Sequence, residues 1–137
     1  HYGSNNMQTT QKFAKSKNVI WITVISSAEG KQGYIQQNDA LNTFASFGSF
    51  PDHILIDENG DLGKKFNAKT TPHIFIADKN KNIVYQGAID DAGGSRFWTT
   101  DLNQSTNFVK KVVNDIKSNK PLSVSKTRPY GCSVKYG

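Results

Sequence analysis

The chain has 137 residues, of which 36% are hydrophobic, and it carries a formal net charge of +6. This length suits one domain, and the apolar share is enough for a modest core, so a wholly disordered chain is excluded. The lysines are scattered, with no block of like charge and no aromatic–arginine platform, so we expect a solvated basic surface and no nucleic-acid partner. No apolar run approaches the ~20 residues that cross a bilayer, so we expect no membrane partner.

The first half of the chain predicts helices alternating with a strand. Residues 4–17 predict a helix of weak periodicity. Residues 19–25 are β-branched and aromatic without polar alternation, which is typical of a strand buried on both faces. A second helix is expected over about 37–47, with Asn38 as its N-cap. This order favours an α/β sheet with helices on both sides.

The middle of the chain predicts mostly strands. Residues 53–57 predict a short strand, and one or two helical turns are expected over 61–67. Two strands at 74–78 and 83–88, joined by a short polar turn, predict an antiparallel hairpin. A long loop over 89–103 follows, of the kind that is functional or mobile.

The last helix, at about 104–119, has the clearest apolar periodicity of the chain. Asp101 and Gln104 have the spacing of a capping box at its start. Residues 121–137 are expected to form an irregular tail of a single domain that spans 1–137. Cys132 in that tail is the single cysteine, so no disulfide can form within the chain.

Several motifs, in this order along the chain, carry a resemblance to a known family. They are His1-Tyr2-Gly3 with Asn6-Met7-Gln8, Ser26-Ser27-Ala28-Glu29-Gly30-Lys31-Gln32-Gly33-Tyr34, Ala68-Lys69-Thr70-Thr71-Pro72-His73, Tyr85-Gln86-Gly87-Ala88-Ile89-Asp90-Asp91, and Thr127-Arg128-Pro129-Tyr130-Gly131-Cys132-Ser133-Val134-Lys135-Tyr136. With them, the chain resembles the bacterial thioredoxin-like redoxins of the alkyl hydroperoxide reductase/thiol-specific antioxidant branch. The resemblance implies a three-layer α/β/α sandwich with a mixed sheet.

The same resemblance implies a thiol-dependent oxidoreductase that reduces peroxides or disulfides without a cofactor. Its partners would be a small thiol, disulfide or peroxide substrate and a reducing protein, in the bacterial cytoplasm or periplasm. Thr71, Pro72 and His73 would bind substrate, with a cis bond before the proline, and Trp98 in the long loop would line the substrate surface. Cys132 is the candidate resolving thiol. A cis bend is expected to leave the backbone beside Pro72 unpaired, so that a substrate adds there as a strand.

Relatives of this type carry a strand and a Cys-Pro motif just before the position of His1. A sequence that opens without an initiator methionine is processed, truncated or an incomplete reading frame. Compared with these relatives, the resemblance implies a chain truncated past that motif, without the central strand and the nucleophilic cysteine. Such a chain would be inactive alone. It would collapse the gap, borrow a strand from another copy in a homo-oligomer, or fold poorly, because unpaired buried backbone groups cost about 1–3 kcal/mol each.

Other readings of the same residues stay open. The rival function is a non-catalytic binding module of thioredoxin fold that uses the Pro72 edge. Asp90 and Asp91 are a candidate acid–base or metal pair, although adjacent carboxylates in a loop are more often solvated. His53 and His73 lack partners at metal-ligand spacing, so we expect them to be structural and expect no metal.

Overall fold

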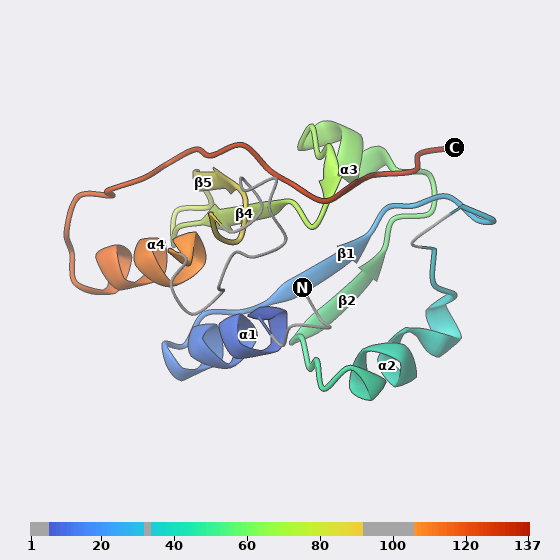
Figure 1. The fold of residues 1–137 in the computed structure, drawn as a ribbon, viewed down its shortest axis with the longest axis horizontal. Helices are drawn as coiled ribbons and strands as arrows, with labels where there is room; N and C mark the ends of the chain where they lie inside the picture. The colour runs from blue at the N-terminus through green and yellow to red at the C-terminus, as the bar shows by residue number, and fades with distance from the viewer. Residues whose placement is uncertain (1–5, 32–33, 92–105) are drawn as a thin grey trace. The chain divides into compact units, whose positions relative to one another are not determined.

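The structure is a computed structural model that describes residues 6–31, 34–91 and 106–137 (Figure 1). This part of the chain is a mixed α/β protein with four helices and three two-stranded sheets. It divides into two compact units, residues 1–68 with 134–137 and residues 69–133, and the expectation of a single domain stays a prediction. The elements are α1 (Asn6–Ser16), β1 (Ile22–Ile25), α2 (Gln37–Ser46), β2 (His53–Ile56), α3 (Asp61–Lys65), β3 (Thr70–Thr71), β4 (Ile74–Ala77), β5 (Ile83–Gly87), α4 (Phe108–Lys117) and β6 (Cys132–Ser133).

The first unit is built on a parallel pair of strands. β1 and β2 run side by side, with Ile22 opposite His53 and Ile25 opposite Ile56 (Figure 1). One face of this pair packs against α2. Its core consists of buried and partly buried apolar side chains, namely Ile25, Ala40, Phe44, Ile35, Ile54 and Ile56. The alternation of side chains along a strand therefore places every second residue of β1 and β2 toward α2.

The other face of β1 corrects the expectation of a strand buried on both sides. Ile22 and Val24 are exposed, and so is Ile20 just before the strand. The strand is also shorter than the predicted range of 19–25. A run of β-branched residues indicates that a strand can be buried on both faces, but the coverage of each face depends on the other elements that pack there.

Two helices of the first unit agree with the sequence except at one cap. α1 buries Met7, Thr10 and Ala14, as its weak periodicity predicts. α2 begins at Gln37, so its N-cap is Gln36 rather than Asn38, and that cap makes no side-chain hydrogen bond. Asn38 was a plausible cap by residue type, but it lies inside the first helical turn.

A carboxylate at the end of β2 organises the turn into α3. Asp57 accepts hydrogen bonds from Ser26 Oγ at 2.7 Å, Gly63 N at 2.8 Å and Leu62 N at 3.1 Å. Burial raises the pKa of Asp57, but these hydrogen bonds outweigh it, so that the pKa lies below its usual value. Asp57 thus links the ends of both parallel strands to the first turn of α3.

Acid is therefore expected to weaken the first unit through Asp57. Because the pKa is lower in the folded chain, this carboxylate stabilises the fold fully above its unfolded pKa of ~3.9, and the contribution is lost as the pH falls through the folded pKa. We expect Asp57→Asn to lower the free energy of unfolding by about 1–3 kcal/mol at neutral pH. As the pH falls below about 4, the free energy of unfolding of this variant should decrease less than that of the native chain. Urea unfolding at a series of pH values measures both effects, with Glu58→Gln as the neighbouring control. Equal acid sensitivity of the native and Asp57→Asn chains would contradict this role.

The second unit contains the hairpin and the terminal helix that the sequence predicts. β4 and β5 pair antiparallel, with Ile74 opposite Gly87 and Ile76 opposite Tyr85. α4 buries Val109, Val112 and Val113, in line with the apolar periodicity. It begins later than predicted, because Asn107 is the N-cap and its side chain accepts a hydrogen bond from Lys110 N at 3.0 Å. The predicted capping box of Asp101 and Gln104 lies outside the described residues.

Candidate functional site

The C-terminal segment of the second unit returns to the residues before Pro72. β3 and β6 form a short antiparallel ladder in which Thr70 lies opposite Ser133 and Thr71 lies opposite Cys132. Thr71 Oγ1 donates a hydrogen bond to the carbonyl oxygen of Cys132 at 3.0 Å. The Thr71–Pro72 peptide bond is cis, as the resemblance implied. Three of the residues singled out in the sequence, Thr71, Pro72 and Cys132, are therefore neighbours in space.

The approach of the two segments depends on a glycine. Gly131 has a φ of +132°, and a Cβ atom at this position would overlap the carbonyl oxygen of Thr71. Glycine alone satisfies both conditions, because it lacks a Cβ atom and adopts positive φ freely. Cys132 itself is an exposed residue and is not part of a disulfide.

The pairing with β6 corrects the expected state of the backbone beside Pro72. We expected this edge to be unpaired and open to an added strand. Instead, β6 already occupies it, through the pairing of Thr71 with Cys132. The sequence gives no sign of this, because a ladder of two residues has no periodicity and its strands are 61 residues apart. The predicted irregular tail thus contains a strand.

His73 follows the proline but is engaged elsewhere. Its Nδ1 accepts a hydrogen bond from the backbone N–H of Lys69 at 3.1 Å, and its ring stacks on Phe75 at 4.5 Å between centroids. Burial, with a smaller effect from the charge of Lys69, lowers the pKa of His73. These contacts agree with a structural histidine that closes the turn before β4. Trp98, the other residue expected to bind substrate, lies outside the described residues.

Asp90 and Asp91 have different environments. Asp90 is 1% exposed and accepts a hydrogen bond from the hydroxyl of Tyr130, whereas Asp91 is exposed and accepts one from Thr106 N at 2.8 Å. The expectation of two solvated carboxylates is therefore wrong for Asp90. Tyr130 stands two residues before Cys132, and its hydrogen bond fixes the start of the segment that leads to the thiol.

A second buried tyrosine holds the same segment further upstream. Tyr85 is fully buried, and its hydroxyl lies 2.7 Å from Thr127 Oγ1. Thr127 Oγ1 also accepts a hydrogen bond from Ala88 N at 2.9 Å. Burial raises the pKa of Tyr85 and the charge of Asp90 adds to this, while the Thr127 hydrogen bond opposes it. The sequence does not identify Tyr85 and Thr127 as site residues, because their role depends on a contact between positions that are 42 residues apart.

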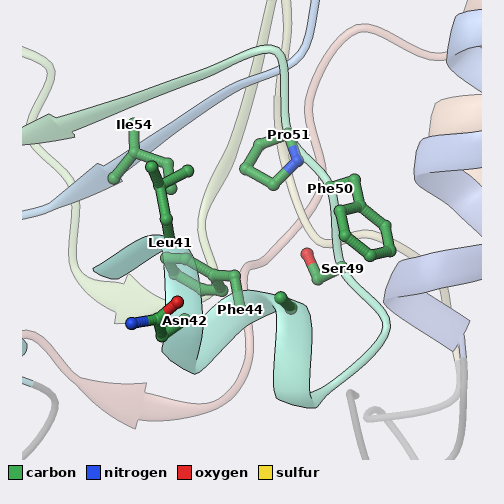
Figure 2. Close-up of a pocket in the computed structure, with 8 residues that line it drawn as sticks. Leu41, Asn42, Phe44, Ser49, Phe50, Pro51 and Ile54 are labelled. Carbon is green, nitrogen blue, oxygen red and sulfur yellow. The ribbon is translucent and has the colours of Figure 1, made fainter. Parts of the chain in front are cut away.

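The rest of the described residues offers no metal site and no membrane-spanning helix, and it contains one apolar pocket in the first unit. No group of three His, Cys, Asp or Glu side chains gathers there in a way that could hold a metal ion. None of the helices described has the length and apolarity to traverse a membrane. In the first unit, a pocket of about 240 Å³ lies between α2 and the segment before β2, lined mainly by apolar side chains such as Leu41, Phe44 and Phe50 (Figure 2). This pocket contains no ionisable side chain, so it offers no acid–base chemistry.

Solved structures resemble this chain in fold. A hypothetical protein from Sinorhizobium meliloti has a TM-score of 0.76 and 18% sequence identity, over 96% of this chain and 70% of its own. An uncharacterised conserved protein from Geobacillus kaustophilus has a TM-score of 0.77 and 18% identity, over 98% of this chain and 70% of its own. Identity at this level shows the fold alone. No protein-family model matches the chain, and no curated protein does.

Proposed function

We propose that this chain is a redoxin-type protein of thioredoxin-like fold whose Cys132 takes part in thiol–disulfide exchange. The position of an exposed Cys132 directly opposite Thr71, next to the cis Pro72, carries this proposal. The parallel pair β1–β2, the antiparallel pair β4–β5 and the final helix α4 occur in the order expected for that fold. The motif resemblance supports the same assignment.

The chemistry follows from having one cysteine. The Cys132 thiolate attacks one sulfur of a disulfide, a new S–S bond forms to Cys132, and the other sulfur leaves as a thiolate. With a sulfenic acid on a partner, the same attack forms a mixed disulfide and releases water. Both reactions require a second sulfur from outside this chain, because Cys132 is its single cysteine. Cys132 therefore has the role of a resolving thiol, and this chain by itself is not a complete peroxidase.

This proposal is preferred over a binding module that adds a substrate strand at the Pro72 edge. The Thr71 side of that edge is paired with β6, so a substrate strand would first have to displace the chain's own segment. Displacement would break the Thr71–Cys132 hydrogen bond. An exposed thiol at the same place needs no such rearrangement.

We expect the native chain to form one mixed disulfide with glutathione when it is incubated with glutathione disulfide. Intact-mass measurement counts the adducts, and peptide mapping locates them. Addition of a reduced dithiol is expected to restore the free thiol, because the exchange is reversible. The Cys132→Ser chain is the control and should gain nothing. A native chain that stays unmodified while the urea-unfolded chain reacts would contradict the proposal.

A further inference from the structure

The backbone on both sides of Asp90 is tied to the residues that lead into α4. The carbonyl oxygen of Ile89 accepts a hydrogen bond from Phe108 N at 2.9 Å. On the other side, Asp91 N donates to the carbonyl oxygen of Thr106 at 3.1 Å. The Asp90 side chain is 1% exposed, and a carboxylate buried to this degree needs hydrogen-bond donors. Asp90 is therefore an acceptor held in a fixed place within the second unit.

Tyr130 uses this acceptor from the C-terminal segment. Its hydroxyl donates a hydrogen bond to the Asp90 carboxylate. Tyr130 lies between two places where the same segment is tied to strands of the second unit. Before it, Thr127 N donates to the backbone of β5, and after it, Cys132 pairs with β3. The Tyr130 hydroxyl thus adds a side-chain contact between these two backbone contacts.

The backbone next to Tyr130 has little to fix its own path. Pro129 has no N–H group to donate. Gly131 has a φ of +132°, and glycine populates both positive and negative φ. A rotation at Gly131 would therefore shift Cys132 along β3 or away from it. The hydrogen bond of Tyr130 opposes such a rotation, because it begins one residue earlier and ends on a fixed carboxylate.

We propose that Asp90 and Tyr130 are positioning residues whose hydrogen bond holds β6 in its register on β3. This register keeps Cys132 opposite Thr71. A sulfur on the β3 side then meets Cys132 at a high effective concentration, which stabilises a disulfide between them. The inference rests on the proposed function in that the register serves exchange only if Cys132 is a redox thiol. The positioning itself belongs to the second unit and can be measured without any reaction of the native thiol.

The reduction potential of an introduced disulfide measures this positioning. In the Thr71→Cys chain, the potential of the disulfide with Cys132 reports how strongly the fold holds the two sulfurs together. We expect the further change Tyr130→Phe to lower the effective concentration of the two thiols by about tenfold, because a hydrogen bond to a charged group contributes at least about that factor. For a two-electron couple, the potential becomes about 30 mV less negative. Equilibration in buffers of oxidised and reduced dithiothreitol, with alkylation and intact-mass measurement, gives the value.

Conservative and matched variants separate positioning from a general loss of stability. Asp90→Asn keeps a carbonyl oxygen that can accept from Tyr130, so its potential should stay close to that of the Thr71→Cys parent, whereas Asp90→Ala should match Tyr130→Phe. The matched control is Tyr136→Phe, which removes another tyrosine hydroxyl, one that donates to Ala68 O at 2.8 Å within the first unit. It should leave the potential unchanged. Circular dichroism shows that both redox forms of each variant are folded, in which case overall stability does not enter the potential.

The results that would overturn the proposal are distinct from those that would contradict the proposed function. An unchanged potential in Tyr130→Phe, an equal change in Tyr136→Phe, or a change in Asp90→Asn as large as in Asp90→Ala would each overturn the positioning role. So would a Thr71→Cys chain that forms no disulfide, because β6 would then not have this register. A native Cys132 that forms no glutathione adduct would contradict the proposed function and would leave these potentials as expected.

Discussion

Replacing Thr71 by Cys is expected to create a disulfide with Cys132 and to stabilise the second unit by about 4 kcal/mol. Residues directly opposite in an antiparallel pair have Cα atoms about 4.5–5.5 Å apart, which is within the range that disulfides span. The bond would close a loop between positions that are 61 residues apart. In the chain-entropy model, closing a loop of that size restricts the unfolded chain and raises the free energy of unfolding by about 4 kcal/mol. Urea unfolding with and without reductant measures the difference.

Thr70→Cys is the matched control for this variant. Thr70 lies opposite Ser133 rather than Cys132, and successive side chains of a strand point to opposite faces. The control chain should therefore keep two free thiols under the same mild oxidation. Equal disulfide formation in both variants, or none in Thr71→Cys, would show that β3 and β6 are not in this register.

The second large effect is expected from Gly87→Ala, at the end of β5. Gly87 has a φ of +143°, and a Cβ atom there would lie 2.8 Å from Thr127 N and closer still to Thr127 Oγ1. Thr127 cannot move away easily, because Thr127 N donates to Gln86 O at 3.0 Å and Gln86 N donates to Ser125 O at 3.1 Å. We expect Gly87→Ala to lower the free energy of unfolding by about 3–5 kcal/mol, because the Cβ atom would meet fixed backbone and the conformation is disfavoured for alanine.

Gly48→Ala separates the two causes of this loss. Gly48 has a φ of +70°, but a Cβ atom there would meet nothing within 4 Å. Its cost should be about 1–2 kcal/mol, which is the conformational penalty alone. Urea unfolding of the two variants measures both values. A similar cost for both would mean that the segment at Thr127 does not pack against β5 as described.

The predictable part of the fold is the part that depends on local pattern. The periodicity of α4 places Val109, Val112 and Val113 in the core, and the turn between two apolar runs predicts the β4–β5 hairpin. Helix ends were less predictable. Asn38 and Asn107 are both good capping residues, and only the second caps a helix, because the choice depends on where packing allows the helix to begin.

The sequence motifs predicted residues of the candidate site, but they did not predict that the two segments carrying these residues pair with each other. Pro72 and Cys132 were found through their motifs, whereas the ladder that joins them is a contact between distant segments. The burial of Asp90 has the same origin, because its partner Tyr130 is 40 residues away. Burial of a polar group requires a hydrogen-bonding partner, and a single sequence does not identify partners at that separation.

The rate of mixed-disulfide formation with glutathione disulfide, measured for the native and the urea-unfolded chain at one pH, tests most directly whether Cys132 is an open redox thiol. Because Cys132 is exposed beside Thr71, we expect the native rate to equal or exceed the unfolded rate. The Cys132→Ser chain sets the background. A native rate lower by about tenfold or more would correspond to a barrier of about 1.4 kcal/mol or more imposed by the fold, and would contradict a thiol held open for exchange.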